Sequence, residues 1–152
     1  MKTDIASNLD DKEQEFVQFG INIQTIASTL TYQANVILKP YNLTFQQYNV
    51  LRILVSAEKK EVSVNYISAR MLDKNSNGSR LVDKLEKKGW VKKEESLIDK
   101  RTVDVQITES GTQILDVVYK IILSEYLGKM SKAISPEEAQ IINLIFNRML
   151  KS

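Results

Sequence analysis

Residues 76–91 read SNGSRLVDKLEKKGWV, and this stretch decides the fold. Its apolar residues are spaced three and four apart, as they are on the buried face of an amphipathic helix. Gly89 follows the last of them, at the place where a glycine typically ends a helix in the left-handed conformation. The pattern therefore predicts a helix over about residues 76–88, with Asn75 or Ser76 as its N-cap.

After Gly89 the period of the sequence changes from that of a helix to that of a strand. Residues 102–107 (TVDVQI) alternate polar and apolar side chains, which is typical of a half-buried strand. Residues 90–95 read as the strand before it, and residues 96–101 as the loop that joins the two. A β-hairpin is therefore expected directly behind the helix.

Two shorter helices are expected before residue 76. Residues 43–48 (LTFQQY) have the pattern of a capping box, and the helix that they begin should run to about Ala57. Its inward face is expected to consist of Val50, Leu51, Leu54 and Val55. Ser63 is expected to cap a second short helix, which ends at a turn over residues 73–75. Three helices followed by a hairpin is the order of a winged helix-turn-helix.

Long amphipathic helices are expected at both ends of the chain. The first is expected over about residues 11–38, because apolar residues recur in steps of three and four from Phe16 to Ile37 and Pro40 then ends the helix. Thr108 should cap a second long helix, and the run 135–138 (SPEE) combines the signals that begin a terminal one. Because so small a domain cannot bury all of these stripes, we expect part of them to face a second copy of the chain.

The expected fold class is mainly α with a small β-hairpin. Residues 1–40 would form an N-terminal dimerisation helix, residues 41–110 a winged helix-turn-helix lobe, and residues 111–152 the C-terminal dimerisation helices.

Positive charge gathers in one window of the chain. Residues 70–101 hold ten basic and six acidic side chains, a net charge of +4, whereas the whole chain has a net charge of only +2. A solvated helix face would explain the charge alone. Because the window covers the helix at 76–88 and the hairpin, the charge favours a nucleic-acid-binding surface.

The residue types of this window suit DNA. Arg80 can donate two hydrogen bonds to a guanine and Asn77 can pair with an adenine, and both share a helix face with Lys84. Ser76 and Ser79 can reach bases or phosphates. The expected hairpin tip adds Asp99, Lys100 and Arg101 as further DNA-binding residues, because an arginine suits a narrow minor groove. Ordinary helix caps and an exposed turn remain the alternative explanation.

Cysteine and histidine are both missing from the chain. Disulfides, Cys/His zinc sites, thiol nucleophiles and histidine general bases are therefore excluded. No clustered acid–base pair or nucleophile is evident, so we expect no catalytic residue, metal or cofactor, and no enzymatic activity. Residues 1–20 lack the pattern of a signal peptide and no apolar run approaches a membrane span, which predicts a cytoplasmic protein without a membrane partner.

Four segments together resemble the MarR family of bacterial transcriptional regulators. They are residues 43–48, residues 79–91 (SRLVDKLEKKGWV), residues 99–101 (DKR) and residues 107–111 (ITESG). No single segment is specific, but the set is, and the flanking helices match the dimerisation region of the family. The resemblance therefore extends over nearly the whole chain.

The resemblance implies a homodimer whose two lobes bind a pseudo-palindromic operator in double-stranded DNA. The helix at 76–88 would lie in the major groove and the wing at 96–101 in the minor groove, with Arg101 oriented by Asp99. Many family members are repressors that small aromatic acids or phenols release from DNA. We therefore expect a transcriptional repressor, with a winged-helix module for protein–protein contact as the alternative.

The chain departs from the family in three places. It lacks cysteine, so the branch that senses oxidants through thiols does not apply. Glu94 and Glu95 stand before the wing, where the family is usually more basic, which weakens the case for strong contacts between the wing and phosphates. Ser68 stands where the family usually has alanine.

A ligand site is harder to place from the sequence. In the family it lies where the dimerisation helices meet the DNA-binding lobe, and Tyr32, Tyr48 and Arg52 could line such a crevice for a small aromatic ligand. The alternative is that the tyrosines belong to the core and that Arg52 makes a surface ion pair.

Overall fold

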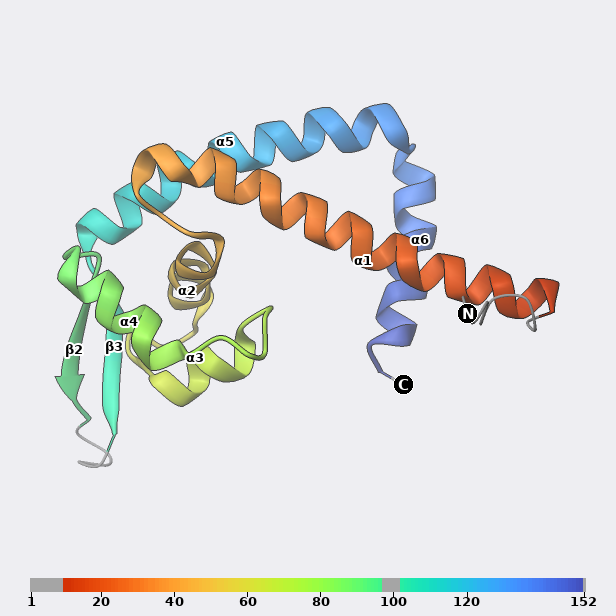
Figure 1. Cartoon of the computed structure of the whole chain (residues 1–152). Helices are drawn as coiled ribbons and strands as arrows, with labels where there is room; N and C mark the ends of the chain where they lie inside the picture. Colours follow the sequence, from red (N-terminus) through yellow and green to blue (C-terminus); the bar gives the residue numbers. More distant parts are fainter. Residues whose placement is uncertain (1–9, 97–101, 152) are drawn as a thin grey trace, which may run out of the picture. The chain divides into compact units, whose positions relative to one another are not determined.

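The computed structural model describes residues 10–96 and 102–151, and the chain divides into two compact units. The first unit ends at Phe45 and the second begins at Gln46. Figure 1 shows the elements of each unit.

The first unit is built around one long helix, α1 (Asp11–Leu38), followed by a 3-10 turn, η2 (Lys39–Tyr41). A capping box begins α1: Glu13 N–H donates to the Asp10 side chain at 2.8 Å, and Asp10 N–H donates to the Glu13 side chain at 2.9 Å. Ala34 and Leu38 are the only buried residues of α1. The turn at Pro40 confirms the end of the helix that the sequence predicts.

The second unit contains the winged helix-turn-helix, and its elements follow in the predicted order. They are α2 (Phe45–Ser56, whose first residue belongs to the first unit), α3 (Val64–Arg70), α4 (Gly78–Lys87), β2 (Val91–Glu95) and β3 (Val103–Ile107). Ser63 caps α3 as expected, because its side chain accepts from Tyr66 N–H. The expected fold class is confirmed.

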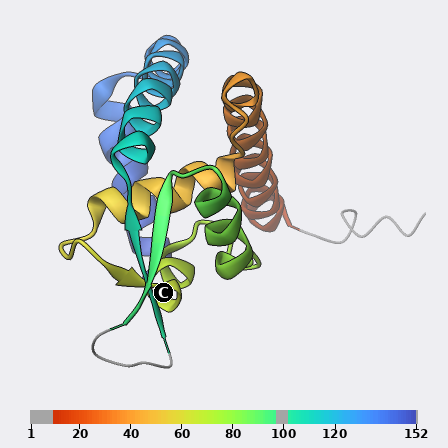
Figure 2. The same ribbon diagram turned by 90° about the vertical axis from the view of Figure 1, so that its left-hand side faces the viewer.

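The sheet has one strand more than the hairpin that the sequence predicts. β1 (Val62–Ser63) pairs antiparallel with β3, so the strand order is β1-β3-β2 (Figure 2). Val62 lies opposite Val105, and Lys93 lies opposite Val105 on the other side of β3. A two-residue strand carries no periodicity, so its pairing partner, and not its own sequence, defines it.

The core of the second unit lies between its helices and the inner face of the sheet. Its largest fully buried side chains are Leu51, Ile67, Met71, Leu85, Val50, Val82, Val105 and Val118. The expectation that Val55 points inward is wrong, since 52% of its surface is exposed. The polar residues Gln47 and Asn49 are buried on α2 instead.

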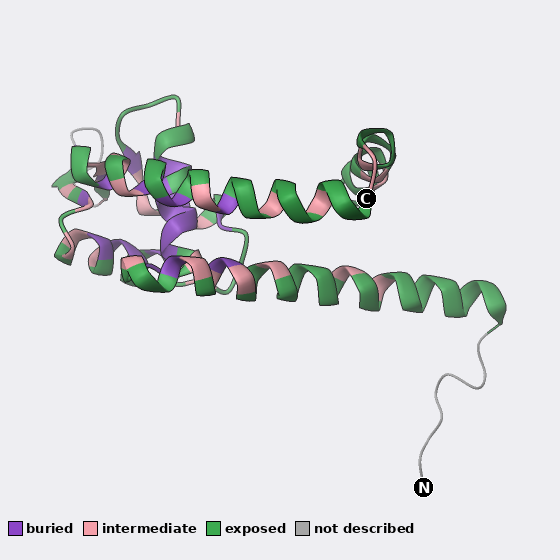
Figure 3. Ribbon diagram, turned by 90° about the horizontal axis from the view of Figure 1, so that it is seen from above, coloured by how far each residue is buried: buried purple, intermediate pink, exposed green. Residues whose placement is uncertain are grey.

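Two helices complete the second unit: α5 (Glu109–Ala133) and α6 (Pro136–Met149). Thr108 caps α5, and Ser135 forms a capping box with Glu138, as predicted. α6 contains no buried residue, as Figure 3 shows at the C-terminal helix. Among the residues described, no helix is both long enough and apolar enough to cross a membrane.

Candidate nucleic-acid interface

The N-terminus of α4 is built by Asn77. Its side-chain Oδ1 accepts the backbone N–H of Arg80 at 3.0 Å, so Asn77 is the N-cap and Gly78 is the first helical residue. The expected caps, Asn75 and Ser76, were therefore one or two residues too early. An amide cap satisfies one free N–H and leaves the others of the first turn available to an anion.

A turn at Gly89 ends α4 and leads directly into the hairpin. Gly89 has φ of 73°, its N–H donates to Glu86 O at 2.8 Å, and Trp90 N–H donates to Leu85 O at 3.0 Å. This pair of bonds is a Schellman motif, and the positive φ confirms the left-handed glycine that the sequence predicts at the end of the helix. The motif fixes the direction in which β2 leaves α4.

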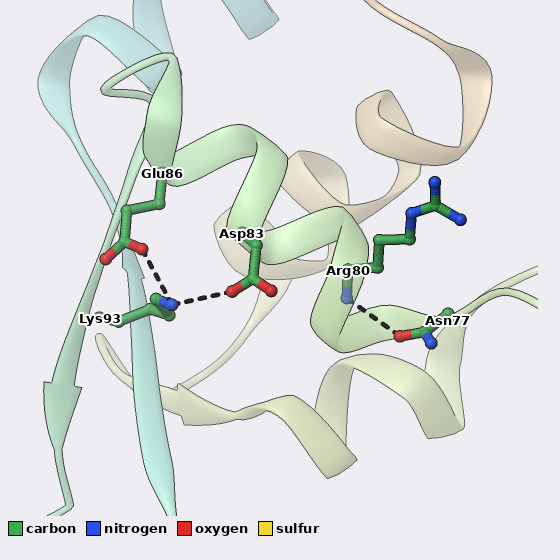
Figure 4. Close-up of polar contacts among 5 residues, drawn as sticks. All are labelled: Asn77, Arg80, Asp83, Glu86 and Lys93. Atoms are coloured by element: carbon green, nitrogen blue, oxygen red, sulfur yellow. Dashed lines mark hydrogen bonds and ion pairs between the residues drawn. The ribbon is translucent and has the colours of Figure 1, made fainter.

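One exposed side of α4 is basic. Arg80, Lys84 and Lys87 are spaced four and three apart, so they share a flank, and all three are exposed. Within residues 10–96 and 102–151, neither Arg80 nor Lys84 forms an ion pair. In Figure 4 the Arg80 side chain points away from the strands and from Lys93. Ser79 is also exposed, whereas Ser76 is half-buried before the helix.

The other exposed side of α4 is acidic, and β2 neutralises it. Lys93 Nζ lies 2.8 Å from Asp83 Oδ1 and 2.9 Å from Glu86 Oε2, so one lysine of β2 binds both carboxylates of the helix (Figure 4). These hydrogen bonds raise the pKa of Lys93. Sequence reasoning missed this cluster, because Lys93 lies on a strand and its partners lie on a helix, and only the geometry of the turn at Gly89 brings them together.

The acidic residues of β2 are partly neutralised by their own strand. Lys92 Nζ lies 2.6 Å from Glu94 Oε1, and this hydrogen bond lowers the pKa of Glu94. Both side chains are about half exposed, at 50% and 55%, so the pair is a weak one. Glu95 is exposed. The three residues expected at the wing tip (Asp99, Lys100 and Arg101) lie outside the described residues.

The turn between α3 and α4 is organised by Asp73. Its carboxylate accepts Asn75 N–H at 3.0 Å and the side-chain amide of Gln46 at 3.0 Å. These two hydrogen bonds, the backbone one above all, lower the pKa of Asp73. Asp73 therefore connects the turn to the first helix of the lobe.

The three residues expected to bind a ligand lie in different environments. Tyr32 is 70% exposed on α1 in the first unit, whereas Tyr48 is 2% exposed on α2 in the second. Arg52 is exposed, with its guanidinium 5.7 Å from the centre of the Tyr48 ring. Burial raises the pKa of Tyr48, Arg52 lowers it in part, and Tyr119 and Tyr126 of α5 raise it further. The α5 phenols therefore lie near Tyr48, which the sequence analysis did not anticipate.

Comparison with known proteins identifies this architecture. Residues 33–118 match the model of a family described as transcriptional regulator SarA/Rot. The chain belongs to this family. The match contains the whole winged helix-turn-helix and the first turns of α5.

Curated relatives of this SarA/Rot-family protein are named as regulators. The transcriptional repressor MprA of Escherichia coli is 31% identical over 88 residues, which are 58% of this chain and 50% of MprA. The HTH-type regulator YfiV of Bacillus subtilis is 34% identical over 101 residues, which are 66% of this chain and 61% of YfiV. The chain thus spans about half the length of the first of these relatives. Both are named as regulators, and neither is named as an enzyme.

Solved structures confirm the MarR-type fold. A mutant of Escherichia coli MarR in complex with operator DNA superposes with a TM-score of 0.79, covering 93% of this chain and 99% of that one at 21% identity. At this identity the match concerns the fold. The resemblance to the MarR family that the sequence motifs indicate is therefore confirmed.

Proposed function

We propose that this SarA/Rot-family protein is a homodimeric transcriptional repressor that binds a pseudo-palindromic operator in double-stranded DNA. α4 lies in the major groove, where Asn77, Ser79 and Arg80 read base edges and Lys84 contacts phosphate. The wing at residues 96–101 reaches the adjacent minor groove. The observation that carries this proposal is the exposed flank of α4, whose arginine and lysine are not engaged by acids of the described residues.

The charge pattern of α4 supports DNA as the partner. A recognition helix presents unpaired donors to base edges and phosphates, and free carboxylates beside them would repel the phosphates. Arg80 and Lys84 supply the donors, whereas Asp83 and Glu86 are bound by Lys93. The relative MprA is named as a repressor, which supports repression as the direction of control.

Exposed apolar side chains support the homodimer. No residue of α6 is buried. The exposed fractions of its large apolar side chains range from 37% to 71% for Ile141, Leu144, Phe146 and Met149. The elbow between α5 and α6 forms an open hollow lined by apolar side chains, among them Leu127, Met130, Ile134, Pro136 and Ala139. Exposed apolar faces favour an interaction site, and a second copy of the same helices has a matching surface.

A small aromatic acid is the proposed releasing ligand. Arg52 offers an exposed guanidinium beside the Tyr48 ring, and Tyr119 and Tyr126 add phenols from α5. A carboxylate would pair with Arg52 while the ring of the ligand packs on Tyr119 and Tyr126, since Tyr48 is buried. A thermal-shift screen of aromatic acids tests this step. A stabilising acid should lose its effect in Arg52→Ala, and an unchanged shift in that variant would place the ligand elsewhere.

The test of DNA binding is a fluorescence anisotropy titration with the DNA upstream of the protein's own coding sequence. We expect affinity at least ~10³-fold tighter than for a scrambled duplex. Affinity should also fall steeply between two salt concentrations, because phosphate contacts release counterions. Weak binding that is equal for both duplexes would contradict the proposal and favour a module for protein–protein contact.

A further inference from the structure

The ion pairs between β2 and α4 determine which charges of the helix are free to meet DNA. α4 carries three basic and two acidic side chains, and the two signs lie on separate rows. Arg80, Lys84 and Lys87 form the basic row, and Asp83 and Glu86 form the acidic one. Free carboxylates so close to a DNA-facing flank would repel the phosphates of the duplex.

Lys93 removes this repulsion and does so from a different element. Its ammonium contacts both carboxylates at 2.8 and 2.9 Å, and 30% of its side chain is exposed. Asp83 and Glu86 keep 50% and 38% of their side-chain surface exposed, so without Lys93 both carboxylates would turn to solvent. The pairing register places Lys93 opposite Val105, a fully buried residue of β3, which holds the strand position of the lysine.

We propose that Lys93 is a positioning residue of the DNA-binding surface: it draws Asp83 and Glu86 to the hairpin side of α4 and ties that helix to β2. Lys93 itself does not contact the duplex. Arg80 and Lys84 then face DNA without competition from the two carboxylates. This inference rests on the proposed function for its effect on DNA, but the tie between α4 and β2 holds in the free protein.

Lys92 provides a matched control on the same strand. Lys92→Ala removes the same charge one residue away, from a lysine whose ion-pair partner is Glu94 of its own strand. It therefore separates a general loss of positive charge from the loss of the contact with α4. Lys93→Arg is the conservative variant, since a guanidinium can donate to both carboxylates.

Hydrogen–deuterium exchange of the DNA-free protein tests the tie itself. Lys93→Ala should speed the exchange of amides in the second half of α4 and in β2, and Lys93→Arg should restore protection. Lys92→Ala should leave the α4 amides unchanged. If Lys93→Ala leaves α4 as protected as in the parent protein, the positioning role is overturned, whatever the protein binds.

A double-mutant cycle with the upstream duplex tests the effect on DNA. Lys93→Ala should weaken specific binding by about three- to tenfold, more than Lys92→Ala does. In a protein that also carries Asp83→Asn and Glu86→Gln, Lys93→Ala should weaken specific binding by less than about twofold, because no carboxylate is left for Lys93 to neutralise. Equal losses in both backgrounds would overturn the screening role.

Salt dependence distinguishes screening from direct contact. A lysine that binds phosphate contributes about 0.9 to the slope of log affinity against log salt, whereas a lysine that binds only carboxylates contributes nothing. Lys93→Ala should therefore keep the parent slope, and a slope reduced by about 0.9 would mean that Lys93 contacts DNA. If the parent protein does not discriminate its duplex, the proposed function fails, and the exchange experiment still decides the tie.

Discussion

At the scale of single residues, Gly78 shows why α4 lies so close to α3. A Cβ built on Gly78 would overlap Ser68 Oγ, whereas the next atom, Ser68 Cβ, lies at an ordinary 3.5 Å. A glycine in the first turn of a helix permits the close approach of another backbone, either that of DNA or that of the preceding helix. The preceding helix supplies a sufficient reason, and it involves the serine that stands where the MarR family usually has alanine.

Gly78→Ala should therefore destabilise the protein by ~1 kcal/mol, because the new methyl group displaces the Ser68 hydroxyl. In a Ser68→Ala background the same change should be neutral or stabilising, since alanine is the better helix former. Urea denaturation of the four proteins measures both values. A Gly78→Ala cost that persists unchanged with alanine at residue 68 would show that Ser68 is not the obstacle.

Asn77 caps α4 and, in the proposed function, also reads a base, and a pair of substitutions can separate the two roles. Its Oδ1 caps α4, and its exposed amide group faces the proposed duplex. Asn77→Asp should preserve stability, because aspartate is an equally good cap, yet weaken DNA binding through repulsion of phosphates. Asn77→Ala should lose ~1 kcal/mol of stability. Thermal unfolding and anisotropy of both variants provide the readouts. If Asn77→Asp binds DNA as tightly as the parent, the residue only caps.

At the scale of the elements, the sequence was informative wherever periodicity and caps were strong. The bounds of α1, the caps Ser63, Thr108 and Ser135, and the glycine that ends α4 follow from local rules, and each was predicted. Local rules failed for β1, which only its partner β3 defines. They also failed for Val55, because tertiary packing buries Gln47 and Asn49 of α2 in its place.

The site was predictable only in part for the same reason. Side chains that share one helix, such as Arg80 and Lys84, can be grouped by their spacing. The link from Lys93 to Asp83 and Glu86 joins a strand to a helix, and it depends on the geometry of the turn at Gly89. The charge count over residues 70–101 includes these residues, but it does not reveal which of them form ion pairs with one another.

The turn between α3 and α4 should respond to acid through Asp73. Hydrogen bonds lower the pKa of this carboxyl in the folded protein, so the folded state favours its charged form. The stabilisation is therefore complete above the unfolded pKa of about 4 and is lost as the pH falls through the lower folded value. Melting temperatures of the parent protein and Asp73→Asn should differ at pH 7, and the difference should shrink as the pH falls below about 4. A constant difference across this range would contradict the assignment.

At the scale of the whole molecule, the proposed dimer should depend on the apolar side of α6. Ile141 is 58% exposed, and burying that remaining surface against a second copy would contribute ~1–2 kcal/mol per side. Ile141→Glu should shift the protein from dimer to monomer in sedimentation velocity at micromolar concentration. Asn143→Glu adds the same charge to an exposed polar position of α6 and should leave the dimer intact. A parent protein that sediments as a monomer would contradict the dimer.

The proposed function depends most on Arg80 of α4, which would read a base in each half of the operator. The most direct measurement compares the parent protein and Arg80→Ala on a panel of upstream duplexes, each with one base pair changed. The parent should lose ~1–3 kcal/mol at one guanine position in each half-site, and Arg80→Ala should be insensitive at those two positions alone. An Arg80→Ala variant with the same base profile as the parent, or a parent indifferent to every substitution, would contradict the account.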